Sequence, residues 1–191
     1  KKVTNETGRA YEKFLDNSSK KAKRLGTTIS DLVSSTADFA RLGYNISDAE
    51  DLAEVANIYA VVGDDIENID TATQSIISTM TAFKIETKDA MTIVDKFNSV
   101  GNKFAISSGG IGDALQRSAS SLAAANNTLD QSIALITAAN TVVQDPDSVG
   151  TAFKTISMRI RAAKTELEDA GLETEGMAES TAELREEILA L

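Results

Sequence analysis

Residues 45–63, NISDAEDLAEVANIYAVVG, decide the fold class because they hold one amphipathic helix with both ends marked. Ser47 and Glu50 have the S-x-x-E spacing of a capping box, in which two side chains satisfy backbone N–H groups at a helix start. Gly63 lies where the helix should end. Between these signals, apolar side chains recur at i, i+3, i+4 and i+7, the spacing of one helix face: Leu52, Val55, Ala56 and Tyr59.

Similar signals punctuate most of the chain. Glycines lie where helices should end, and Ser, Thr or Asp lie where the next ones should begin. We find no window of alternating apolar residues long enough for a strand. The signals are Gly26 and Gly43 as helix ends, Ser30, Asp70 and Thr87 as helix starts, a break at residues 107–110 (SSGG), capping boxes at Thr128/Gln131 and Ser180/Glu183, and a turn at residues 145–148 (DPDS).

The predicted caps Ser47, Thr87 and Thr128 are spaced by 40 and 41 residues, a period typical of stacked helical pairs. Two-helix units of ordinary length would produce the same spacing without duplication, so both origins stay open. We predict an all-α fold: a bundle of antiparallel amphipathic helical hairpins with helical extensions at both ends. The predicted divisions are an N-terminal charged helix (1–26), a helical core (27–165), and an acidic joint with the start of a further helix (166–191).

Composition narrows the chemistry that the protein can perform. The chain has no Cys and no His, which removes disulfides, thiol nucleophiles, zinc–thiolate sites and imidazole bases. The remaining carboxylates, hydroxyls and amines fall into no catalytic signature. We therefore expect no enzyme activity, no catalytic residues, no metal and no cofactor.

The net charge of −10 is unevenly distributed. Residues 1–26 hold eight Lys and Arg against three acids, whereas residues 165–191 hold one Arg against nine acids. The acidic total disfavours specific nucleic-acid binding, and no apolar run is long enough to span a bilayer. Because the chain starts without Met and ends inside a helical pattern, we expect it to be a piece of a longer protein.

Residues 150–164, GTAFKTISMRIRAAK, form a basic stretch in this acidic chain. Its apolar positions follow a 4-3-4-3-4 spacing, the seam of a helix packed along another. The seam would either close the core or dock a second helix. It comprises Val149, Phe153, Ile156, Ile160, Ala163 and Leu167.

The bases of this stretch define a second predicted feature, a candidate interaction face. Lys154, Arg161 and Lys164 share one side of the helix, away from the seam. They would pair with acids of the chain, form a solvated face, or bind an acidic partner. Exposed ion pairs contribute only about 0–1 kcal/mol each, so stability gives little reason to gather bases here. The face comprises Gly150, Thr151, Lys154, Arg159, Arg161 and Lys164.

The ordered set of segments resembles the core region of phage tail tape measure proteins. The succession is SDAEDLAEVANIYA, TATQSIISTMTAFKI, TKDAMTIVDKFNSVGNKF, IGDALQRSASSLAAANNTLDQSIALITAAN and GTAFKTISMRIRAAK. The last segment is similar to the family's Gly-Thr-Ala-(Leu/Phe)-Arg/Lys motif, with Phe153 where Leu is common and Lys154 where Arg is common. The resemblance covers about residues 27–165.

The resemblance implies a structural and assembly module of a phage or prophage tail. The family sets tail length, templates tail-tube assembly and leaves the tube during DNA ejection. Implied partners are the tail-tube protein, tail assembly chaperones, baseplate or tail-tip proteins, and further copies of the chain. The implied locations are the tail-tube lumen of the virion and the host cytoplasm during assembly.

Two other functions remain open from the residues alone. A helical signalling or coiled-coil adaptor domain shares the Ala/Ser/Thr-rich composition, although glycines interrupt long heptad runs here. A lytic module of a tail protein would need two close carboxyl groups in a cleft, which sequence separation cannot reveal.

Overall fold

The computed structural model describes residues 8–174, 177–178 and 180–189. These residues contain nine α-helices, one 3₁₀ turn and no strand, which confirms the predicted all-α class. The elements are α1 (Gly8–Leu25), α2 (Ile29–Arg41), α3 (Ile46–Val62), α4 (Ile69–Phe83), the 3₁₀ turn η1 (Thr87–Asp89), α5 (Met91–Gly101), α6 (Ser108–Ala124), α7 (Leu129–Val143), α8 (Pro146–Asp169) and α9 (Thr181–Leu189).

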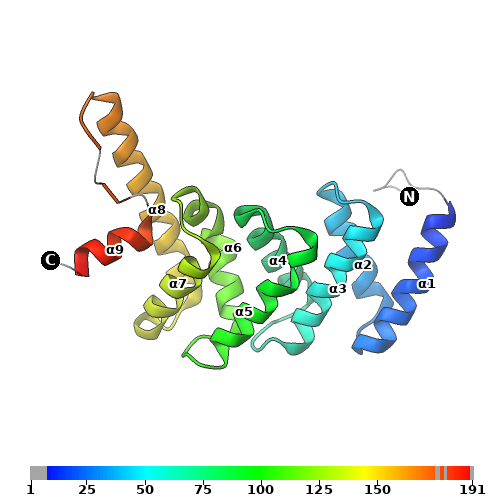
Figure 1. Ribbon diagram of the computed structural model, residues 1–191. Helices are drawn as coiled ribbons and strands as arrows, with labels where there is room; N and C mark the ends of the chain where they lie inside the picture. Colours follow the sequence, from blue (N-terminus) through cyan, green and yellow to red (C-terminus); the bar gives the residue numbers. More distant parts are fainter. Residues whose placement is uncertain (1–7, 175–176, 179, 190–191) are drawn as a thin grey trace.

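The helices form an elongated stack of hairpins, with α1 at one end and α8 and α9 at the other (Figure 1). Successive even-numbered helices pack in one row, α2 on α4, α4 on α6 and α6 on α8. The odd-numbered helices α1, α3 and α5 form a second row, and α7 packs on α6, α8 and α9. Each helix thus touches only near neighbours in the chain, as in repeat architectures.

The core lies between the two rows. Every apolar position predicted for α3 is buried, and the Tyr59 ring packs edge-on against Phe97 of α5. The Tyr59 hydroxyl donates to the Ser108 carbonyl oxygen at 2.7 Å, which ties α3 to the start of α6. Small side chains such as Ala49, Ala53 and Ala56 let the backbones approach closely.

Several predicted caps lie two residues too far along the chain. Thr28 caps α2 with Asp31 as its box partner, Asn45 caps α3, and Asn68 caps α4. Ser30, Ser47 and Asp70 instead lie within the first helical turns. The reason is that a cap must have extended backbone angles, and the earlier polar residue adopts them in each case. The Thr128/Gln131 capping box is confirmed.

The capping-box partner predicted at Glu50 has a different role. Its side chain is buried and faces Lys21 of α1, at 3.4 Å from the ammonium. Thr87, predicted as the start of a helix, is the first residue of the short turn η1. The α-helix that follows, α5, begins only at Met91.

The SSGG segment begins a helix, contrary to the predicted break. Ser107 caps α6 by accepting from the Gly110 N–H, and residues 108–110 are its first turn. A Cβ atom at Gly109 would lie 2.1 Å from the Asp65 carbonyl oxygen. Gly109 therefore serves close packing of α6 against the α3–α4 loop, while Gly110 lies against Pro146.

The N-terminal charged helix is present as α1, from Gly8 onward. Phe14, Ser18 and Ala22 form its buried stripe, while the apolar Leu15 is 41% exposed. The Tyr11 side chain lies outside the described set. The three predicted divisions of the chain stay a prediction.

Candidate interaction surface

The predicted basic stretch lies in α8, the longest helix. Asp145 caps it by accepting from the Ser148 N–H, and Pro146 occupies its first position, which confirms the predicted start at residues 145–148. Asp147 binds the guanidinium of Arg117 on α6 through two hydrogen bonds. The N-terminal half of α8 is thereby fixed to the stack.

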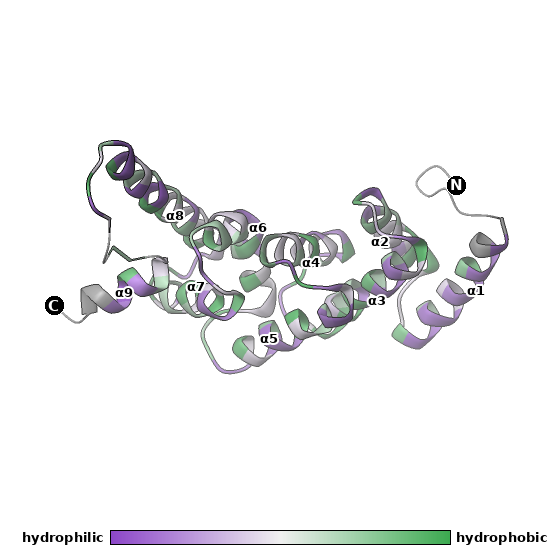
Figure 2. Cartoon of the chain, turned by 45° about the horizontal axis from the view of Figure 1, so that its top comes forward, coloured by the Kyte–Doolittle hydropathy of each residue, from purple (hydrophilic) through white to green (hydrophobic). Residues whose placement is uncertain are grey.

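The two halves of α8 have different surroundings. Val149 and Gly150 are buried where the first half packs on α6 and α7, and Ser157 is buried beside Thr181 of α9. The second half projects from the stack (Figure 1), and its end is coloured hydrophilic (Figure 2). The helix therefore presents a structured but largely solvent-exposed arm beyond about residue 158.

The predicted seam is divided between these halves. Val149 is buried and Phe153 packs against the core, whereas Ile156 is 42% exposed. In the projecting half, Ala163 is exposed and Ile160 and Leu167 are half-buried. The seam thus closes the core only at its N-terminal end, and its role as a docking surface stays a prediction.

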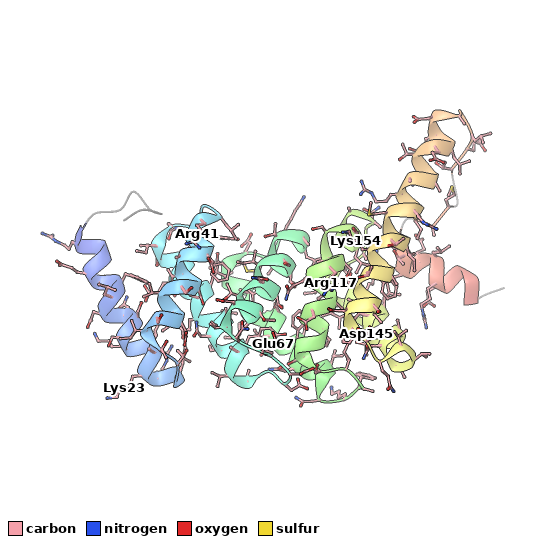
Figure 3. All side chains as sticks on the ribbon, turned by 180° about the vertical axis from the view of Figure 1, so that it is seen from behind. Lys23, Arg41, Glu67, Arg117, Asp145 and Lys154 are labelled. Atoms are coloured by element: carbon pink, nitrogen blue, oxygen red, sulfur yellow. The ribbon has the colours of Figure 1, made fainter. Side chains whose placement is uncertain are left out.

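The predicted basic face is mostly exposed. Lys154, Arg159 and Arg161 are exposed and form no ion pair with any described residue, while Lys164 is half-buried. Lys154 lies on the side of α8 seen in Figure 3, near Arg117 of the adjacent helix. Thr151 is exposed, and its hydroxyl donates a hydrogen bond to the Asp147 carbonyl oxygen at 2.9 Å. Gly150 contacts α6 and is unavailable to a partner.

A buried polar cluster holds α9 against the stack. The Asn127 side chain donates to the Leu122 and Ala125 carbonyl oxygens at 3.0 and 3.1 Å. It accepts from the Ala182 N–H at 3.0 Å. The Thr181 hydroxyl lies 3.2 Å from Ser157 Oγ on α8. The sequence offered only a weak sign of this cluster, an Asn before the Thr128 cap.

Charged residues also join α1 to α3. Lys21 lies 2.9 Å from Glu54 and 3.2 Å from Asp51, and Arg24 also binds Glu54. Burial opposes the charge of Lys21, but hydrogen bonds to Glu54 and Asp51 and the nearby Glu50 outweigh it, so the Lys21 pKa is raised. This group was not recognised from sequence, because its members are separated by about 30 residues.

The described residues contain no group of three potential metal ligands. None of the described helices is both long and apolar enough to cross a bilayer.

The chain matches the sequence profile of a family described as phage-related minor tail protein, over residues 19–190. The chain belongs to this family. No solved structure matches it. The match extends beyond the region of resemblance, 27–165, and includes part of α1, the acidic segment and α9.

Membership in the minor tail protein family gives the chain a structural role in a phage tail. The largely exposed second half of α8 is the candidate contact surface of the chain. The cluster around Asn127 and the Lys21 group are internal and serve to hold the stack together.

Proposed function

We propose that this chain is a helical core module of a tail tape measure protein, acting without catalysis. The observation that carries the proposal is the family match, combined with an elongated hairpin stack whose two ends lie far apart (Figure 1). Such a stack is extended in one direction, because each hairpin packs only on its neighbours. The proposed settings are the tail-tube lumen and, during assembly, the host cytoplasm.

In this proposal the parent protein sets tail length and templates the tail tube, and it leaves the tube during DNA ejection. A continuous α-helix supplies about 1.5 Å of length per residue. The stacked hairpins described here instead form a folded module attached to such a ruler. Its partners would be the tail-tube protein, tail assembly chaperones, and baseplate or tail-tip proteins.

The proposed contact with these partners is the basic side of α8. Lys154 and Arg161 lie on one side of the helix, are exposed, and have no ion pair among the described residues. An acidic surface, such as the inner wall of the tail tube, would complement them. Electrostatic contacts of this kind mainly set orientation and association rate.

Binding to the tail-tube protein of the same phage or prophage tests the contact. The double variant Lys154→Ser/Arg161→Ser should keep its helical circular dichroism spectrum and bind the tube protein at least fivefold more weakly, since each charge contributes up to about 1 kcal/mol. Lys13→Ser/Lys23→Ser removes two exposed charges from α1 and is the matched control. Equal binding by both variants and the wild type would refute the docking face.

The tape measure role has a separate test. In-frame deletions in continuous helical segments of the parent protein, outside this folded module, should shorten tails by about 1.5 Å per deleted residue in electron micrographs. Tails of unchanged length would contradict the role and leave membership in the tail family intact. Purified protein should also release nothing from peptidoglycan, whereas measurable release would support a lytic module.

A further inference from the structure

A groove between α5 and α7 is open to solvent. Its volume is about 450 Å³, within the roughly 300–1,000 Å³ of ligand-binding clefts. Val100 and Phe104 form its α5 wall, and Ile133, Ala134 and Ala138 form its α7 wall. The Phe104 side chain, in the turn after α5, is 57% exposed. This α5–α7 groove thus combines apolar walls with an accessible aromatic ring.

The groove exists because the two rows of helices are packed unequally. In the even-numbered row, small residues bring the backbones together: a Cβ atom added at Gly112 of α6 would lie 2.7 Å from the Ser75 hydroxyl oxygen of α4. Helices α5 and α7 lie on the same side of α6 (Figures 1 and 2), and α7 packs on α6, α8 and α9. The space between α5 and α7 therefore follows from the fold and not from one short side chain.

The other flank of α7 shows which kind of element this helix accepts. There α9 packs on α7, and its Ala182 and Leu184 line cavities together with Leu135 and Ala138. Ala138 and Ala134 line the spaces on both flanks, so α7 has a ridge of small, exposed side chains between them. A short amphipathic helix fills one flank, and no described residue fills the other.

The two ends of the groove differ in charge. At one end, Lys96 of α5 binds Asp130 of α7 across the groove. Toward the other end, Lys103 precedes Phe104, is exposed, and forms no ion pair with any described residue. Asp130 is the only acid among the described residues that line the groove. A carboxylate would therefore complement the end near Lys103.

We propose that the α5–α7 groove binds an amphipathic helix of another protein, as α9 packs on the other flank of α7. This bound helix carries large aliphatic side chains on the face that enters the groove, because alanines form much of the α7 wall. It carries a carboxylate where it passes Lys103. Phe104 is the main anchor, since aromatic side chains dominate the binding energy of such interfaces. The contact is helix-in-groove recognition.

Selection of peptides tests the chemistry of the occupant directly. A yeast-displayed library of helix-forming peptides of 15 residues, the length of α7, is selected on the purified chain. Enriched peptides should carry Leu, Ile or Met at i, i+3, i+4 and i+7, with Asp or Glu near one end. An enriched peptide is then synthesised and titrated against variants of the chain by fluorescence anisotropy.

Variants of the groove locate the binding. Phe104→Ala should weaken binding of the enriched peptide at least tenfold, because the aromatic anchor is lost. Ser99→Gln/Thr141→Gln places a longer side chain at an exposed position on each wall and should weaken binding by a similar factor. The matched control is Leu42→Ala, which truncates a 54% exposed side chain at the end of α2 and should leave binding unchanged. Circular dichroism and thermal melting establish that the variants are folded.

The predicted carboxylate contact has a test of its own. Lys103→Glu should weaken binding of the acidic peptide at least fivefold, because an attraction becomes a repulsion. Lys23→Glu, at an exposed position of α1, is the control that should leave it unchanged. A new selection on Lys103→Glu should enrich peptides with Lys or Arg at the same end. An unchanged charge preference would refute recognition of a carboxylate by Lys103.

Three outcomes would overturn the proposal. One is that no enriched peptide binds more tightly than about 1 mM, the weak end of specific recognition. Another is equal binding by the wild type and Ser99→Gln/Thr141→Gln. The third is self-association of the wild type that this double variant abolishes in analytical ultracentrifugation, which would assign the groove to a second copy. These assays contain no other tail protein, so their results are independent of the proposed tape measure role.

Discussion

The backbone of Gly150 in α8 lies directly on that of Ala114 in α6. A Cβ atom added at Gly150 would lie 2.5 Å from the Ala114 carbonyl oxygen and 2.8 Å from its Cα. Glycine in a helix interior usually destabilises by about 0.5–1 kcal/mol relative to alanine. At this position the close approach of two helices reverses that preference.

We therefore expect Gly150→Ala to lower the free energy of unfolding by about 1–3 kcal/mol, the range for overpacked sites. Urea denaturation followed by circular dichroism measures the change. Ala152→Val, at an exposed position of the same helix, should change stability by less than about 1 kcal/mol. A stabilised Gly150→Ala protein would refute the close packing of α6 and α8.

Lys21 should contribute to stability where the neighbouring Lys20 does not. Lys21→Met leaves Glu50, which is 7% exposed, without its cation. We expect a loss of about 1–3 kcal/mol, since an uncompensated, largely buried charge remains. Lys20→Met, which removes only an exposed pair with Asp16, should cost less than about 0.5 kcal/mol. Equal effects in urea denaturation would contradict this assignment.

The contribution of Lys21 should also depend on pH in a defined direction. Its folded-state pKa lies above the ordinary value of 10.5. The stabilisation is therefore complete below pH 10.5 and is lost as pH rises through the raised pKa. The stability difference between wild type and Lys21→Met should be constant from pH 7 to 9 and shrink in stronger base.

Asp113 should destabilise the folded chain at neutral pH. Burial raises the pKa of Asp113, and the charges of Asp147 and Asp65 raise it further, while Arg117 acts in the opposite direction. A raised carboxyl pKa means that the ionised form is less favourable in the folded state. We expect Asp113→Asn to be more stable than the wild type at pH 7.

That gain should fall as pH decreases through the raised pKa and vanish below the ordinary value of 3.8, where both states are protonated. Thermal melting across pH 3–7 measures it. Asp95→Asn, on the exposed face of α5, provides the comparison. A destabilised Asp113→Asn protein at pH 7 would show that the carboxylate has a favourable partner instead.

Asn127 should control the attachment of α9. Asn127→Ala removes the acceptor of the Ala182 N–H and the donor to two buried carbonyl oxygens. Unsatisfied buried groups cost about 1–3 kcal/mol, so amide exchange in α9 should become at least fivefold faster. Exposed Asn102 provides the control variant Asn102→Ala. Unchanged exchange in α9 would show that other contacts hold it.

Helix α3 was predicted correctly in its buried face and its end at Gly63, because the 3.6-residue period of its apolar residues is a local property. Its cap was placed two residues too late. The SSGG segment was interpreted as a break, because the nearby backbone of Asp65, which requires glycine at position 109, is 44 residues away in the chain.

For the candidate surface on α8, too, sequence predicts some features and only the structure shows others. The seam and the bases of α8 were identified from spacing and charge, and the resemblance to tail proteins followed from the order of segments. Sequence could not show that the seam changes from buried at Val149 to exposed at Ile156. That change depends on which part of α8 packs on α6 and α7.

The sequence by itself determined the helical class, the approximate helix positions and the uneven distribution of charge, since these depend on neighbours within a few turns. Only the tertiary structure decided that the hairpins stack in two rows, that Lys21 meets Glu54, and that half of α8 projects into solvent. These features arise from contacts between residues tens of positions apart, which no local spacing encodes.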